Sequence, residues 1–148
     1  MLKNPDQNLG LKHRKRSSKP NGRPEKQVEK EVTAWLNQNG FYCHVVESKA
    51  VYSQAAGQYL RGQTVPGMSD IIGVTPINGV ACFIELKAKG RRSVLSASQK
   101  HFLKTNIEMD AFAVCVDSAT LLETYYAEFK EIYGNKPKAR SYLLSLID

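Results

Sequence analysis

The sequence lacks any apolar run of the roughly 20 residues that a bilayer-spanning helix needs. Its basic N-terminus also lacks the apolar segment of a secretory signal. We therefore expect no membrane partner and a cytoplasmic protein, a description that also fits a phage-encoded chain acting in host cytoplasm. The few cysteines, Cys43, Cys82 and Cys115, lie far apart in apolar surroundings and are typical of buried thiols. The three histidines show no ligand spacing, so the sequence does not suggest a zinc site.

Positive charge is concentrated at the N-terminus. Residues 1–23 hold seven basic residues and one acid, whereas residues 24–148 hold 14 basic and 13 acidic residues. Residues 1–22 also lack an apolar period, so we expect a flexible basic tail followed by one domain over residues 23–148. The tail is either a solvated arm or a DNA-contacting arm that adds affinity without sequence selectivity. Its densest basic residues are Lys12, Arg14, Lys15 and Arg16.

The domain begins with a predicted helix from Pro24 to a stop signal at Gly40. Its apolar residues recur with helical spacing and form one core-facing stripe. Glu25 and Glu29 lie one turn apart, in or beside that stripe, where carboxylates are unusual. They either complement the helix dipole at the edge of the stripe or serve a site.

The rest of the chain alternates between strand-like and helical patterns. Residues 48–66 lack a sustained period and are predicted to form a long loop that contains Arg61. Asn78-Gly79 is a strong hairpin signal between two of the strands, and Gly90-Arg91-Arg92 is a short basic turn. The predicted elements are strands at 41–47, 70–75 and 79–87, a helix from Ser96, a fully buried strand at 111–117, a helix from Ser118 to about Gly134, and a final helix at 139–147. This order predicts an α/β protein with a mixed sheet flanked by helices, and with additional C-terminal helices.

The strand around Glu85 places charge where a core strand has no need of it. Alternation puts Cys82, Ile84 and Leu86 on one face and Glu85 and Lys87 on the other. The Asn-Gly hairpin also brings Asp70, at the start of one strand, close to the end of its neighbour. Paired carboxylate oxygens suit Mg²⁺ or Mn²⁺. A nearby lysine can orient or deprotonate an attacking water and stabilise charge on a phosphate, so the pattern indicates phosphodiester hydrolysis.

Three motifs carry a family resemblance: Gly67-Met68-Ser69-Asp70, Glu85-Leu86-Lys87, and Gln99 near the start of its helix. Together they resemble the PD-(D/E)xK nuclease superfamily, and within it the small VRR-NUC nucleases and archaeal-type Holliday-junction resolvases. The resemblance covers roughly residues 25–118 and implies a restriction-endonuclease-like core in the order α-β-β-β-α-β. Ser69 replaces the proline that names the motif, which shapes the backbone and is not a ligand.

The resemblance also implies roles for individual residues. Asp70, Glu85 and the backbone carbonyl of Leu86 would bind Mg²⁺ or Mn²⁺, Lys87 would be the catalytic lysine, and Gln99 the supporting glutamine. The family's helical glutamate, which acts through a water, matches either Glu29 or Glu25. We assign it to Glu29 and keep Glu25 as the alternative.

The function predicted from these residues is a divalent-metal-dependent DNA endonuclease acting on branched, flapped or single-stranded DNA. Resolution of a four-way junction would require a symmetric homodimer with two sites. One alternative is a non-catalytic nucleic-acid-binding module that uses the tail, Arg61, Arg91 and Arg92, with a vestigial site. Another is a structural protein in which Glu85 merely pairs with Lys87.

Overall fold

A computed structural model describes residues 24–47, 51–60, 65–92 and 94–148. The basic tail, Lys12, Arg14, Lys15 and Arg16 with it, and Arg61 lie outside these residues. In chain order the elements are α1 (Pro24–Gln38), β1 (Tyr42–Val45), β2 (Val51–Ser53), β3 (Gln58–Leu60), β4 (Ile71–Val74), β5 (Ala81–Leu86), α2 (Ala97–Glu108), β6 (Phe112–Val116), α3 (Ala119–Ile132) and α4 (Lys136–Ile147). None of the described helices has the length and apolar character to cross a bilayer.

The main sheet has four strands in the order β1-β4-β5-β6 and is mixed. Strand β4 runs antiparallel to β1 and β5, whereas β5 and β6 are parallel and are joined by α2. The turn between β4 and β5 contains Asn78 and Gly79, both with positive φ (50° and 65°), as a two-residue hairpin turn prefers. The predicted α/β architecture with a mixed sheet is therefore confirmed.

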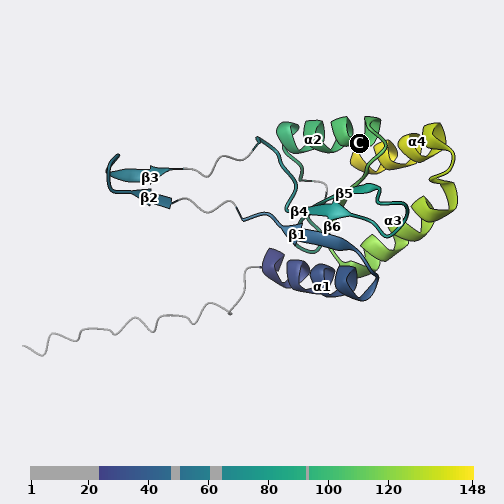
Figure 1. Cartoon of the computed structure of the whole chain (residues 1–148), viewed down its shortest axis with the longest axis horizontal. Coiled ribbons are helices and arrows are strands. Elements are labelled where there is room, and N and C mark those ends of the chain that lie inside the picture. Colours follow the sequence, from purple (N-terminus) through teal and green to yellow (C-terminus); the bar gives the residue numbers. More distant parts are fainter. Residues whose placement is uncertain (1–23, 48–50, 61–64, 93) are drawn as a thin grey trace, which may run out of the picture.

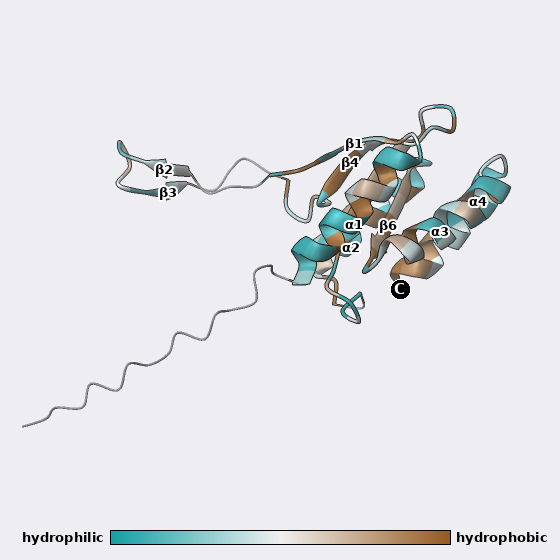
Figure 2. Cartoon of the chain, turned by 90° about the horizontal axis from the view of Figure 1, so that it is seen from below, coloured by the Kyte–Doolittle hydropathy of each residue, from teal (hydrophilic) through white to brown (hydrophobic). Residues whose placement is uncertain are grey.

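Helices cover both faces of this sheet (Figure 1). Helices α1 and α3 lie on one face, where Trp35 and Phe112 both contact the ring of Tyr126. Helices α2 and α4 lie on the other, where Phe83 of β5 packs edge-on against Phe102. In Figure 2 the sheet and the inward faces of the helices are hydrophobic, and the outward faces are hydrophilic. All five residues of β6 are buried, as its continuous apolar run predicts.

Gly73 of β4 allows two cysteines to share one face of the sheet. It lies between Cys43 of β1 and Cys82 of β5 in the strand register. A Cβ atom at this position would lie 2.1 Å from the Tyr42 carbonyl oxygen and 2.9 Å from the Cys43 sulfur. All three cysteines are free, but Cys43 is only half-buried, because β1 is the edge of the sheet. The prediction of a buried thiol is wrong for Cys43 and confirmed for Cys82 and Cys115.

Two further predictions about the elements are corrected. The segment 48–66 is not a structureless loop, because β2 and β3 form an antiparallel hairpin within it. Figure 1 shows this hairpin projecting from the end of the sheet at which β1 finishes. Helix α4 begins at Lys136, three residues before the predicted start, because Asn135 caps it and Pro137 fits its first turn.

Candidate active site

The hairpin of β4 and β5 brings Asp70 to Glu85. Ile71 pairs with Ile84 in the antiparallel register, so Asp70, one residue before Ile71, lies across from Glu85, one residue after Ile84. The Oδ2 atom of Asp70 accepts a hydrogen bond of 2.8 Å from the backbone N–H of Leu86. This bond holds the Asp70 carboxylate directly beside the end of β5.

Glu85 is buried, with 3% of its surface exposed, yet only half of its carboxylate is satisfied. Its Oε1 atom lies 2.6 Å from the Gln99 amide nitrogen and 3.6 Å from Lys87 Nζ. Its Oε2 atom is buried and has no hydrogen-bond partner among the described residues. Burial, and then the charge of Asp70, raise the pKa of Glu85 to about 8. An oxygen left in this state is costly unless a donor or a cation reaches it.

Gln99 connects the site to α2 through both ends of its side chain. Its Oε1 atom accepts the backbone N–H of Ser96 at 2.9 Å, which completes a capping box, and also lies 3.3 Å from Lys87 Nζ. Its Nε2 atom donates to Glu85. Gln99 therefore both completes the capping box, as predicted, and contacts Glu85 and Lys87, so the cap fixes the amide that holds these two side chains.

Gly67 allows the loop before Asp70 to press against α2. Its φ is +76°, and a Cβ atom there would lie 2.2 Å from the backbone oxygen of Ser98 and 2.7 Å from the backbone nitrogen of Gln99. Only glycine fits this approach. The sequence motif includes Gly67, but the contact that requires a glycine there was not predicted, because it joins segments 31 residues apart. Beside this contact lies a polar hollow of about 220 Å³, with Asp70 and Gln99 in its lining.

The two glutamates of α1 differ in their surroundings. The charge of Glu25 is one of the influences that raise the pKa of Asp70, although burial is the largest. Glu29 instead pairs with Lys26, its carboxylate oxygens 3.2 Å from Lys26 Nζ, and 26% of its side chain is exposed. Glu25 is exposed and Glu29 is half-buried, but the influence of Glu25 on Asp70 and the pairing of Glu29 with Lys26 favour Glu25 as the helical carboxylate of the site.

The arrangement fits Mg²⁺ or Mn²⁺ through few protein ligands. Within the described ranges, no three His, Cys, Asp or Glu residues converge as a ready-made cation cage. Mg²⁺, however, is commonly held by one or two carboxylates, with waters and substrate phosphate completing its octahedron. Asp70 and the unpartnered oxygen of Glu85 could provide two such ligands. The N–H and C=O of one strand residue point to the same side, so the Leu86 carbonyl lies on the Asp70 side as well.

Two of the predicted DNA-contacting arginines lie on the surface after β5. Arg91 and Arg92 are both exposed. Their turn is fastened to the sheet by the Gly90 N–H, which donates to Asp117 Oδ2 at 3.0 Å. Arg92 lies over the ring of Tyr125, with its guanidinium carbon 5.8 Å from the ring centroid. This turn therefore presents positive charge only a few residues beyond Lys87.

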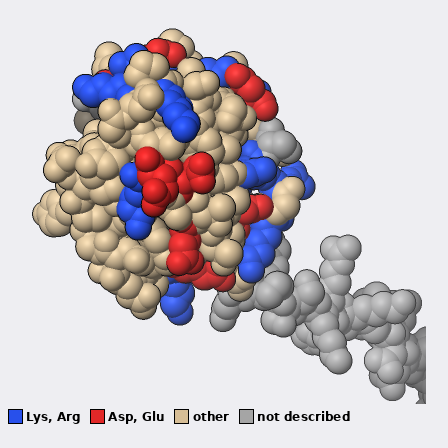
Figure 3. All heavy atoms as spheres, turned by 90° about the vertical axis from the view of Figure 1, so that its right-hand side faces the viewer, with Lys and Arg blue, Asp and Glu red and all other residues tan. Residues whose placement is uncertain are grey.

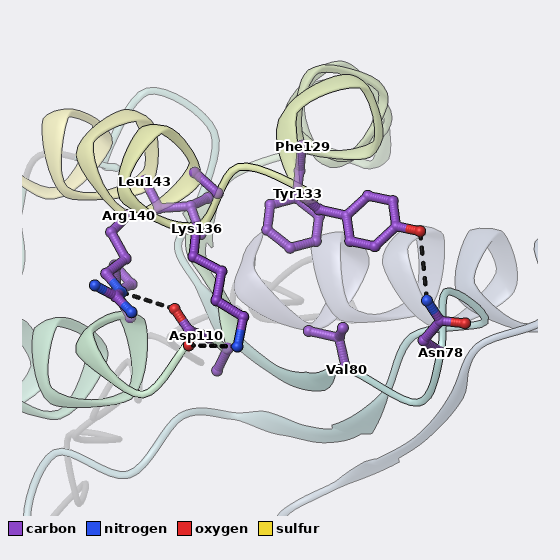
Figure 4. A pocket seen from close by; sticks show the side chains of 12 residues that line it. Asn78, Val80, Asp110, Phe129, Tyr133, Lys136, Arg140 and Leu143 are labelled. Atoms are coloured by element: carbon purple, nitrogen blue, oxygen red, sulfur yellow. Dashed lines mark hydrogen bonds and ion pairs between the residues drawn. The ribbon is translucent and has the colours of Figure 1, made fainter.

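A second pocket lies at the opposite end of β5 (Figure 4). It has a volume of about 300 Å³ and an apolar lining that contains Val80, Phe129, Tyr133 and Leu143. At its rim, Asp110 accepts a hydrogen bond of 2.7 Å from Arg140 and pairs with Lys136 at 3.4 Å. Figure 3 faces this end of the molecule, where acidic and basic side chains lie next to one another.

Comparison of the chain with protein-family models, with curated proteins and with solved structures finds no match in any of the three.

Proposed function

We propose that the chain is a divalent-metal-dependent DNA endonuclease with a restriction-endonuclease-like core of the PD-(D/E)xK type. The observation that carries this proposal is the buried, unpartnered Oε2 atom of Glu85 beside Asp70, with Lys87 and Gln99 on the same carboxylate. A structural pair of Glu85 and Lys87 would leave no reason for a second carboxylate to lie beside it. A cation between the two acids would give the unpartnered oxygen a partner and would allow Glu85 to ionise beside Asp70.

The ligands of the proposed cation are Asp70, Glu85 and the Leu86 carbonyl, with Glu25 acting through a water. When bound, a divalent cation neutralises charge that develops on the phosphate and makes water a better nucleophile. Lys87 then has two functions: its ammonium group stabilises negative charge on the phosphate, and it orients the attacking water. Gln99 keeps Lys87 in place, since its Oε1 atom lies 3.3 Å from the lysine nitrogen.

DNA is the substrate that the surrounding charge favours. Arg91 and Arg92 lie on the turn after the catalytic strand, and the 23 N-terminal residues hold seven of the chain's basic residues. Such charges bind phosphates without reading sequence. We therefore propose that selectivity is for DNA structure, namely branched, flapped or single-stranded DNA.

The test is a cleavage panel of four-way junction, flap, duplex and single-stranded DNA, with Mg²⁺, Mn²⁺ or EDTA. We expect cleavage with either metal, none in EDTA, and loss of cleavage in Asp70→Asn and Lys87→Ala. Unchanged cleavage in both variants would refute the assignment. DNA binding without cleavage under every condition would instead indicate a non-catalytic binding module.

Light scattering on the same preparation addresses how junctions would be cut. Two symmetric incisions require two active sites, so a junction resolvase is expected to be a homodimer. A monomer that cuts flaps or single strands would place the protein among structure-specific nucleases that make one incision.

A further inference from the structure

The β2–β3 hairpin carries two exposed tyrosines that face each other. Tyr52 and Tyr59 are partners in the hairpin register, and their ring centroids lie 5.2 Å apart at an angle of 66°. They are 53% and 71% exposed. A two-stranded hairpin has no core of its own and is marginally stable in water. No part of the chain that the structure describes buries either of the two rings.

The residues that flank the hairpin in sequence lie beside the proposed active site. After β1, the backbone N–H of Val46 donates to the backbone oxygen of Asp70 at 2.8 Å. Val46 and Val65, which lie before and after the hairpin in sequence, both line the polar hollow beside Asp70 and Gln99. Whatever the hairpin binds is thus tethered next to the site.

The length of the chain limits how far from the site such a contact can be. Tyr52 follows Val46 by six residues, so its Cα atom lies at most about 20 Å away from that of Val46. Stacked DNA rises about 3.4 Å for each nucleotide of a strand. The tyrosines can therefore contact nucleotides within about six of a phosphate bound at Asp70.

The charge and chemistry of this segment favour nucleic acid as its occupant. From Ser48 to Ser69 the sequence contains no Asp or Glu and two basic residues, Lys49 and Arg61. A second copy of this chain, with its net charge of +7, is a poorer electrostatic match than a polyanion. Exposed aromatic rings in a segment whose only charged residues are basic suit the stacking of unpaired bases, which is largely independent of sequence.

We propose that the hairpin selects the DNA structure that is cut, with Tyr52 and Tyr59 stacking on unpaired bases next to the scissile phosphate. This inference rests on the proposed nuclease function and specifies its substrate class. Fully paired duplex offers no free base faces, so the tyrosines favour DNA with single-stranded character. The body supplies the chemistry, and the inserted hairpin supplies the preference.

The test compares a Tyr52→Ala/Tyr59→Ala double variant with two controls. Tyr52→Phe/Tyr59→Phe keeps both rings, and Tyr42→Ala removes an equally exposed tyrosine (69%) from β1 of the body. Fluorescence anisotropy in EDTA measures binding to single-stranded, forked and fully paired oligonucleotides without cleavage. We expect the double alanine variant to bind single-stranded and forked DNA roughly ten- to a hundredfold more weakly. Duplex binding should change less than about twofold, and both controls should bind like the wild type.

The proposal would be overturned by unchanged binding of unpaired DNA by the double alanine variant, by an equal loss of binding to duplex, or by failure of the wild type to bind DNA. A different oligomeric state of the double alanine variant in light scattering would also overturn it, because the hairpin would then be a contact between protein chains.

Cleavage assays separate the hairpin assignment from the proposed nuclease function. If the wild type binds unpaired DNA through the tyrosines but cuts nothing, the nuclease function fails and the hairpin assignment stands. If the double alanine variant keeps the wild-type substrate preference in both binding and cleavage, the hairpin assignment fails and the nuclease function stands.

Discussion

Each end of the main sheet holds a cluster of charged side chains, and the two clusters differ in how far their negative charge is neutralised. At one end Asp110 has two cationic partners, Arg140 and Lys136, whose hydrogen bonds and charges lower its pKa. At the other end a single lysine, Lys87, contacts Glu85, and burial raises the pKa of both Asp70 and Glu85. The first cluster is neutralised by the protein itself. The second lacks positive charge, which is the state expected where a cation or a substrate completes the balance.

This contrast separates a cluster that suits a stabilising role from one that suits the proposed function, without reference to motifs. A surface acid with two cations contributes modestly to stability and is complete. A buried carboxyl group whose oxygen lacks a hydrogen-bond partner lowers the stability of the protein when no cation is bound. Such a loss of stability is commonly found at functional sites. The same change, from an acid to its amide, should therefore have different consequences for cleavage and for stability in the two clusters.

The largest expected effect is on cleavage. Glu85→Gln removes a proposed cation ligand, and we expect the rate of DNA cleavage with Mg²⁺ to fall about 10²- to 10³-fold. Asp110→Asn is the matched control, because it also replaces an acid by its amide and because asparagine tolerates the positive φ of 69° at that position. It should keep the wild-type rate within about twofold. Equal losses in both variants would contradict the distinction between the clusters.

The next effect is on stability as a function of pH in the absence of divalent cations. The pKa of Glu85 is raised from an ordinary value of 4.5 to about 8, so the folded protein holds this proton more tightly than the unfolded chain. The free energy of unfolding of the wild type should therefore fall as pH rises from about 4.5 to 8, by on the order of 5 kcal/mol. Glu85→Gln should lack this decline and be more stable than the wild type at pH 9.

Chemical denaturation between pH 4 and pH 9 measures this difference. Addition of Mg²⁺ at pH 8 should narrow it, because a cation that binds only the folded wild type stabilises it by mass action. Parallel curves for the two proteins between pH 5 and pH 8 would mean that Glu85 does not titrate as its surroundings require.

A smaller effect distinguishes the two glutamates of α1. Glu25→Gln should slow cleavage about 10- to 100-fold, the usual cost of removing a group that acts through a water or an outer ligand. Glu29→Gln should remain within about threefold of the wild type, since its carboxylate is already paired with Lys26. Single-turnover cleavage of a preferred substrate measures both. If Glu29→Gln slowed cleavage more than Glu25→Gln, Glu29 would be the helical glutamate of the site.

The smallest effect concerns Asp110 itself. Because its pKa is lowered by Arg140 and Lys136, its contribution to stability is present above its ordinary pKa of 3.8 and disappears as the pH falls through the lower folded value. Asp110→Asn should therefore be slightly less stable than the wild type at pH 7. In urea denaturation the two proteins should converge at a pH low enough to protonate Asp110 in the folded state. A persistent difference at that pH would point to packing rather than charge.

The strands and helices of the body could be predicted because their signals are local. The Asn-Gly turn, the capping box at Ser96 and the apolar run of β6 each act over a few residues. The turn then fixes a register in which Asp70 lies across from Glu85, so this part of the candidate site follows from sequence as well. Gln99 follows from the same capping box.

Other features depended on distances that a sequence pattern does not encode. Glu25 and Glu29 share a helix face, so periodicity cannot tell them apart; they differ in position along the axis and in the nearby Lys26. Strands β2 and β3 have three residues each, too few to show an alternation. The close contact between Gly67 and the start of α2 joins a loop to a helix that begins 30 residues later, so only the three-dimensional structure reveals it.

The position of the hairpin between β1 and β4 also bears on how the protein could change over time. These neighbouring strands are already joined by a connection of 25 residues, between Val45 and Ile71. Halving such a connection alters its closure entropy by only about 0.6 kcal/mol. The hairpin can therefore be shortened, lengthened or exchanged at little cost to the body, and a nuclease built in this way could acquire a new substrate preference while its chemistry stays the same.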